Sequence, residues 1–144
     1  MAWIADFHIH SHFSMATSKE SNPRSLSRWA GLKGVSLLGT GDFTHPGWRR
    51  ELSEALIPAE PGFYKLKEEL VPEIPNQPEV RFVVSGELST IYKKNGRVRK
   101  VHHLIILPSL ESAERISERL SDLGMNIRSD GRPILGMDSY DLFG

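Results

Sequence analysis

Two histidines separated by one residue, and preceded at the same spacing by an aspartate, are the side chains best placed to do chemistry. They lie in the run Asp6-Phe7-His8-Ile9-His10. Because alternate residues of a β-strand point to the same face, Asp6, His8 and His10 would share one side of a strand. Two imidazoles arranged in this way are suited to hold one divalent metal ion. The alternative, an exposed polar face of an ordinary strand, is disfavoured by the apolar residues between them.

A second group of polar residues follows the next predicted strand, in the run Gly39-Thr40-Gly41-Asp42-Phe43-Thr44-His45. In parallel α/β folds, ligands bind at the edge where strands end and helices begin. The two glycines would allow another backbone to approach closely. Asp42 and His45 are therefore candidates to bind a metal ion or to transfer a proton. The alternative is that they only cap the helix that follows.

Glu87 lies late in an apolar strand, where a buried carboxylate is costly unless it is paired or bound to metal. It could bridge two cations, as carboxylates do where two ions lie about 3.5–4 Å apart. The alternative is a glutamate that faces water. His102 and His103 begin another apolar run. Adjacent strand residues point to opposite faces, so only one of them should face the site, and the spacing leaves open which one.

The densest group of basic side chains surrounds a predicted hairpin turn and contains no acidic residue. Such a group could contact the phosphates of a nucleic acid. The equally simple alternative is a solvated hairpin whose charges protect an edge strand. The basic residues are Lys93, Lys94, Arg97, Arg99 and Lys100.

Alternating strand-like and helix-like segments must position these residues, which indicates an α/β fold. Asn95-Gly96 predicts a tight hairpin turn of type I′. Prolines divide residues 57–79 into short pieces, with one or two helical turns near 64–70. Strands are predicted at 3–9 (buried), 35–38 (buried), 81–91, 98–107 and 134–135. Helices are predicted at 23–33, from 45–46 onward, at 109–123 and from 138 onward.

Length and composition set limits on this fold. The chain has 144 residues, enough for one domain, whereas a complete eight-unit α/β barrel needs about 250. Acidic and basic residues number 18 each, so only a local patch could indicate nucleic-acid binding. Cysteine is absent, which excludes disulfides and thiolate metal sites. No apolar run predicts a membrane helix or a secretory signal, and we therefore expect a cytoplasmic protein.

The motifs together resemble the N-terminal motifs of the polymerase and histidinol phosphatase (PHP) family. The segments 17–19, 38–46, 86–92 and 98–103 resemble more specifically its endonuclease Q branch. The family resemblance implies a distorted α/β barrel that binds two or three Zn, Mn or Fe ions and hydrolyses phosphoesters. The branch resemblance implies an enzyme that nicks DNA on the 5′ side of deaminated bases such as uracil and hypoxanthine.

The resemblance also implies roles for individual residues. His8 and His10 match the first metal-binding pair of the family, and Glu87 matches its bridging glutamate. His103 is favoured over His102 as the histidine of the following strand, because it directly precedes the leucine-rich run. Phe43 occupies the position of the histidine that usually follows Asp42, and His12 is an imperfect substitute for the usual loop histidine. The candidate metal ligands are thus His8, His10, Asp42, His45, Glu87, His102 and His103, and the catalytic candidates are Asp42, His45 and Glu87.

The family pattern continues with further histidines, whereas this sequence has none after His103. We therefore expect residues 1–144 to form the N-terminal part of a PHP domain: a partial barrel with a hairpin at about 80–107, lacking the C-terminal strands and helices. Its exposed edge near Ile134 would be covered by a second copy or would favour aggregation. The expected function is phosphodiester hydrolysis with Zn, Mn or Mg, in a DNA repair endonuclease. The alternatives are a small-molecule phosphomonoesterase and a non-catalytic folded fragment.

Overall fold

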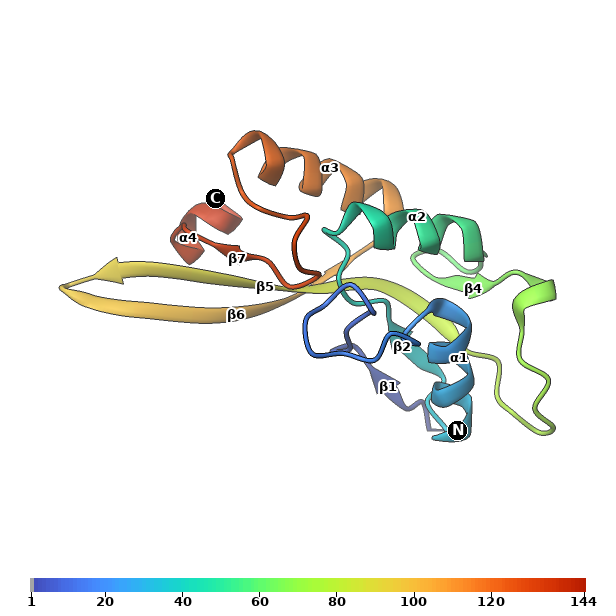
Figure 1. Ribbon diagram of the computed structural model, residues 1–144. Helices are drawn as coiled ribbons and strands as arrows, with labels where there is room; N and C mark the ends of the chain where they lie inside the picture. The colour runs from blue at the N-terminus through green and yellow to red at the C-terminus, as the bar shows by residue number, and fades with distance from the viewer. Residues whose placement is uncertain (1) are drawn as a thin grey trace.

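The computed structural model describes residues 2–144, which form a mixed α/β fold (Figure 1). The predicted fold class is confirmed at this level, although the sheet is not closed into a barrel within these residues. The elements in chain order are β1 (Ala5–Asp6), α1 (Pro23–Leu32), β2 (Leu37–Gly39), α2 (Pro46–Ala55), β3 (Leu56–Pro58), β4 (Tyr64–Leu66), the 3-10 helix η1 (Glu68–Leu70), β5 (Arg81–Lys94), β6 (Arg97–Leu107), α3 (Leu110–Asp122), β7 (Ile134–Leu135) and α4 (Ser139–Phe143).

One mixed sheet with the strand order β1-β2-β5-β4-β3 organises the fold. Strands β1, β2 and the first residues of β5 run parallel, whereas β3 and β4 pair antiparallel. Beyond this sheet, β5 continues and pairs with β6 antiparallel and with β7 parallel. Because β1, β2 and β5 are parallel, the residues that follow β1 and β2 come to the same edge, beside the middle of β5.

The second half of β5 and the whole of β6 form a long two-stranded arm that extends away from the body (Figure 1). Asn95 and Gly96 connect the strands with φ angles of 53° and 71°. Both angles are positive, as a type I′ turn requires, and the hairpin predicted from the Asn-Gly pair is confirmed.

The hydrophobic core lies between the sheet and the helices α2 and α3, which Figure 1 shows on one side of β5. Trp48 of α2 is completely buried, and its indole Nε1 donates to the carbonyl oxygens of Thr40 and Gly41 at 3.1 and 2.9 Å. Phe43 and Phe82 are completely buried beside it. The core therefore fixes the segment that follows β2, which carries Asp42.

Two predicted segments differ from the structure. The first is the buried strand at 3–9, of which only Ala5–Asp6 pairs with β2. This strand is at the edge of the sheet, so Trp3 and Ile4 are exposed, and the chain leaves the sheet before His8. The second is the segment 57–79, where β3 and β4 form an antiparallel pair that we did not predict, although the predicted helical turn near 64–70 is present as η1. Among the described residues, no helix has both the length and the apolar character needed to cross a membrane.

Candidate metal centre

His8, His10 and Glu87 converge although 79 positions of sequence separate the first from the last. Nε2 of His8 lies 2.8 Å from Oε2 of Glu87, and Nε2 of His10 lies 3.4 Å from the same oxygen. One ligand atom from each residue falls within 4.8 Å of the others. These three side chains, hereafter the His/Glu cluster, could hold a metal ion, as their types predicted.

Asp42 lies behind His10 and is completely buried. Its Oδ2 accepts hydrogen bonds from the backbone N–H of Ser11 (2.7 Å) and from the hydroxyls of Ser11 (2.6 Å) and Ser14 (2.8 Å). Its Oδ1 lies 3.2 Å from Nδ1 of His10. Burial acts to raise the pKa of Asp42, but the hydrogen bonds from His10, Ser11 and Ser14 outweigh burial and hold it below the usual value. Asp42 is therefore ionised at neutral pH.

The ionised Asp42 carboxylate defines the orientation and the proton position of the His10 ring. Because a carboxylate can only accept, Nδ1 of His10 must carry the proton and donate it to Asp42. In the neutral imidazole, Nε2 then presents a lone pair toward Oε2 of Glu87, 3.4 Å away. Two acceptors facing each other at this distance repel unless a metal ion or a second ring proton lies between them. This donor set fits a divalent metal ion, and a carboxylate–histidine pair is the usual support for such a ligand.

Glu87 is the group on which the imidazoles converge. Its side chain is 11% exposed, and its Oε1 lies 2.6 Å from Nδ1 of His102, while Oε2 faces His8 and His10. Burial acts to raise the pKa of Glu87, but the hydrogen bond from His8 and the charges of His8, His10 and His102 outweigh burial and lower it. Each carboxylate oxygen thus faces a different group of imidazole nitrogens.

Ser85 connects the segments that carry the cluster with the segment that carries Asp42. Its hydroxyl donates to the carbonyl oxygen of Phe7 and accepts from the N–H of Gly41, both at 3.1 Å. Its own N–H donates to the hydroxyl of Thr40 at 3.1 Å. One buried serine of β5 thereby sets the distance between the segments that follow β1 and β2.

The adjacent histidines of β6 lie on opposite faces of the arm. His102 contacts Glu87 and the hydroxyl of Ser89, so it adjoins the His/Glu cluster. His103 points the other way, where Nε2 lies 3.2 and 3.0 Å from the hydroxyls of Thr90 and Ser139. In this structure His102, and not the favoured His103, therefore faces the cluster, and which of the two binds a metal stays a prediction. The register pairs Leu88 with His103 and Ser89 with His102, which puts His102 on the face of Glu87.

His45 and His12 lie outside the cluster, and each already has partners. Nδ1 of His45 accepts from the N–H of Gly47 at 3.2 Å, and Nε2 donates to the carbonyl oxygen of Arg128 at 2.9 Å. Both nitrogens are occupied, so His45 acts in this structure as the N-cap of α2, and its expected ligand role lacks support. Nε2 of His12 lies 2.8 Å from both carboxylate oxygens of Glu51.

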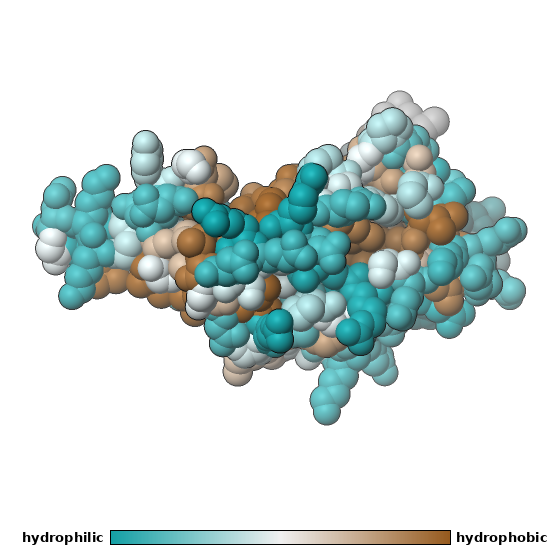
Figure 2. All heavy atoms as spheres, turned by 90° about the horizontal axis from the view of Figure 1, so that it is seen from above, coloured by the Kyte–Doolittle hydropathy of each residue, from teal (hydrophilic) through white to brown (hydrophobic). Residues whose placement is uncertain are grey.

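The five basic residues of the arm are divided between its two faces. Residues directly opposite each other in an antiparallel pair share a face. One face of the arm carries the pairs Glu87–Leu104, Ser89–His102, Ile91–Lys100 and Lys93–Val98. The other face carries the pairs Leu88–His103, Thr90–Val101, Tyr92–Arg99 and Lys94–Arg97. Only Lys93 and Lys100 therefore share the face of Glu87. Figure 2 shows hydrophilic residues covering the far end of the arm and hydrophobic ones gathered along its side.

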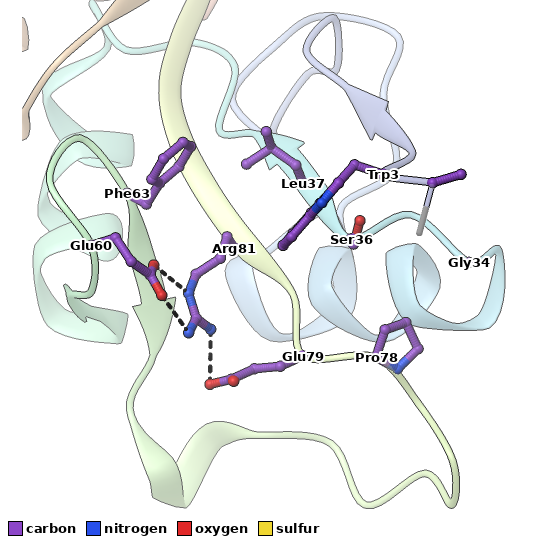
Figure 3. Close-up of a pocket in the computed structure, with 10 residues that line it drawn as sticks. Trp3, Gly34, Ser36, Leu37, Glu60, Phe63, Pro78, Glu79 and Arg81 are labelled. Carbon is purple, nitrogen blue, oxygen red and sulfur yellow. Dashed lines mark hydrogen bonds and ion pairs between the residues drawn. The ribbon is translucent and has the colours of Figure 1, made fainter.

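A cavity of about 880 Å³ lies at the opposite end of the same strands (Figure 3). Trp3 and Leu37 line it together with Arg81, whose guanidinium contacts the carboxylates of Glu60 and Glu79, each at 2.8 Å. The residues that line it lie at or before the first residues of β1, β2 and β5, or between β3 and β4, whereas the cluster follows β1 and adjoins the middle of β5. We therefore assign this cavity no part in the metal site.

No protein-family model matches the chain. Individual proteins do match it. An uncharacterized protein from Methanocaldococcus jannaschii is 32% identical over 137 residues, which cover 95% of this chain. The crystal structure of the lesion-specific endonuclease PfuEndoQ from Pyrococcus furiosus is 32% identical, with a TM-score of 0.75 over 96% of this chain. A structure of endonuclease Q in complex with a 27-mer duplex substrate, with an abasic lesion at the active site, gives a TM-score of 0.76 over the same share.

The chain spans 14% of the length of the Methanocaldococcus protein and 30% of the length of each endonuclease Q chain. Its fold thus resembles part of an endonuclease. At 32% identity, the similarity includes the amino-acid sequence as well as the fold.

Several residues around the site escaped the sequence analysis. Ser11 and Ser14 hold Asp42, and the segment that contains Gly131 packs against it. Ser11 directly follows His10, and a hydroxyl next to a predicted ligand is a signal that could have been used. No pattern in the sequence connects Gly131 with Asp42, because 88 intervening residues and the whole sheet determine that contact.

Proposed function

We propose that this chain forms part of a metal-dependent phosphodiesterase that acts on DNA. The observation that carries the proposal is the convergence of His8, His10 and Glu87 in a fold that resembles part of endonuclease Q at 32% identity. The protein would belong to the PHP family, and residues 1–144 would contribute the N-terminal portion of its metal site.

His8 and His10, through their Nε2 atoms, and Glu87, through its carboxylate, would hold a divalent ion. The oxygen of Glu87 beside His102 would be available to a second ion. An ion held there would supply a Lewis acid for the phosphate oxygens and would lower the pKa of water. We propose Zn, Mn or Mg as the metal, with two or three ions in the complete domain.

The chain's own residues would orient the ligands and the substrate. Asp42 fixes the His10 ring, so that its role is positioning, and His45 only begins α2. His8 is half exposed, so water and substrate can reach the cluster on that side. Lys93 and Lys100 extend from the cluster face of the arm, where they would hold the phosphates of a DNA backbone.

The substrate we propose is DNA that contains a lesion: a deaminated base such as uracil or hypoxanthine, or an abasic position. The damaged nucleotide would be drawn out of the stack, since unpairing costs least at a lesion. The support is the endonuclease Q structure that contains a duplex substrate with an abasic lesion.

The test is strand cleavage by the protein that carries this chain, with wild-type and Glu87→Gln forms compared. Labelled duplexes with one hypoxanthine, uracil or abasic position are incubated with Mn, Mg or Zn, and an undamaged duplex is the control. We expect a metal-dependent nick 5′ of the lesion that the E87Q substitution abolishes. Cleavage of a small phosphomonoester without any nicking would favour the phosphatase alternative, and no hydrolysis by metal-loaded protein would contradict the proposal.

A further inference from the structure

A segment far from the cluster in sequence closes over the residues that support His10. This segment, residues 128–132, follows α3 and is hereafter the strap. Its backbone carbonyl at Arg128 accepts from Nε2 of His45 at 2.9 Å, and the N–H of Gly131 donates to the carbonyl oxygen of Phe13 at 3.3 Å. The guanidinium of Arg132 donates to the carbonyl oxygen of Met15 at 2.9 Å. The strap is thus bonded to the loop that follows His10.

Gly131, at the centre of the strap, is buried against Asp42. A Cβ atom at this position would overlap the carboxylate of Asp42 and would lie 2.7 Å from the hydroxyl of Ser14. The backbone of Gly131 has no positive φ angle, so the requirement for glycine comes from space alone. The surface of the strap therefore forms one wall of the Asp42 environment.

Asp42 cannot move away from an added methyl group without losing its partners. Its side chain is short and completely buried, and Ser11, Ser14 and His10 hold both of its oxygens. A shift that relieves the overlap breaks one or more of these bonds. The bond to His10 is the longest of them, at 3.2 Å, and it is the one that sets the proton on Nδ1.

We propose that the strap is a positioning element of the His/Glu cluster, with Gly131 as its critical residue. It confines the Asp42 carboxylate and, through it, the tautomer and orientation of the His10 ring. None of its residues belongs to the cluster itself. This role rests on the proposed function, because the position of His10 determines the affinity of the metal site.

Gly131→Ala tests the strap, and Gly136→Ala is a matched control in the same C-terminal region. A Cβ at Gly136 meets nothing within 4 Å, so G136A adds the same methyl group in open space. The first readout is the ¹⁵N NMR signal of the His10 ring in the metal-free protein. We expect protonation at Nδ1 in wild type and G136A, and loss of this preference in G131A.

The second readout is the affinity for Mn or Zn, measured by calorimetry. Changes in groups that support a metal-binding histidine reduce metal affinity by about 10–100-fold, and we expect about a tenfold loss in G131A with none in G136A. If G131A does not fold, Arg132→Ala replaces it, because this variant removes the bond to Met15 without adding atoms. It should shift the same two readouts in the same direction.

An unchanged His10 tautomer and unchanged affinity in the folded G131A variant, or in R132A where that variant is used, would overturn the proposal. The NMR readout needs no metal. A wild-type protein that binds no ion would therefore contradict the proposed function and leave the role of the strap to be decided by the His10 signal.

Discussion

At the scale of single residues, the site depends on where one proton lies. His10 presents Nε2 to the cluster because the ionised Asp42 accepts a hydrogen bond from Nδ1. Asp42 remains ionised in a buried place because Ser11 and Ser14 supply three further hydrogen bonds. The orientation of the His10 ring is thus set by residues outside the His/Glu cluster.

Asp42→Asn should weaken metal binding although Asp42 lies outside the cluster. An amide can present N–H groups to Nδ1 of His10, which favours the tautomer with its proton on Nε2 and removes the ligand lone pair. We expect the affinity for Mn or Zn to fall about 10–100-fold. Calorimetry on D42N, with Asp141→Asn at the exposed α4 as the control, measures this. Equal affinities in the two variants would contradict the role given to Asp42.

The adjacent histidines of β6 provide a second test at this scale. His102 contacts Glu87, whereas His103 contacts Thr90 and Ser139 on the other face. His102→Ala should reduce metal affinity or the number of bound ions, and His103→Ala should leave both within error of wild type. Metal analysis of the two purified variants decides between them. A larger effect from H103A would show that the assignment is reversed.

At the scale of elements, the β5–β6 arm separates its charges by register. Lys93 and Lys100 lie on the face of Glu87, and Lys94 and Arg97 lie on the other. We expect Lys93→Ala with Lys100→Ala to reduce DNA nicking more than the control pair Lys94→Ala with Arg97→Ala, which removes the same charge.

Salt dependence provides the measurement for the arm. Each lost phosphate contact lowers the slope of log affinity against log salt concentration by about 0.9. The K93A/K100A pair should therefore lower the slope by up to about 1.8, and the control pair should change it less. Equal effects of the two pairs on nicking and on slope would mean that DNA contacts both faces of the arm.

The ion pair between Glu60 and Arg81, at the end of the strands away from the cluster, should affect the stability of the protein in acid. Hydrogen bonds from Arg81 lower the pKa of Glu60 from 4.5 to about 2 (Figure 3). Because this pKa is lower in the folded state, the stabilisation is complete above about pH 4.5 and is lost as the pH falls toward 2. Glu60→Gln should lose less stability than wild type across this window, by a small amount since Glu60 is 57% exposed.

Urea denaturation at several pH values between about 5 and 2 measures the effect, with Glu20→Gln at an exposed position as the control. A steeper loss of stability in E60Q than in wild type would contradict the sign of this prediction.

At the scale of the whole molecule, the sequence predicts the local features and leaves the three-dimensional contacts undetermined. The hairpin followed from Asn95-Gly96, and the cluster residues followed from their types and from the family resemblance. The choice between His102 and His103 required the β5–β6 register, which no local pattern contains. The short exposed β1 likewise depends on its place at the sheet edge.

Distant contacts explain the rest of what sequence reasoning missed. The proposed role of the strap depends on the packing of Gly131 on Asp42 across the folded chain. His45 looked like a ligand because it follows β2, but its ring nitrogens are used by Gly47 and Arg128.

Whether His8, His10 and Glu87 form a metal site is measured by titrating Mn or Zn into the metal-free chain by calorimetry. We expect saturable binding of at least one ion per chain, abolished by Glu87→Gln or His10→Ala and retained in His45→Ala. No binding by the folded wild-type chain, or binding that persists unchanged in both cluster variants, would contradict this expectation.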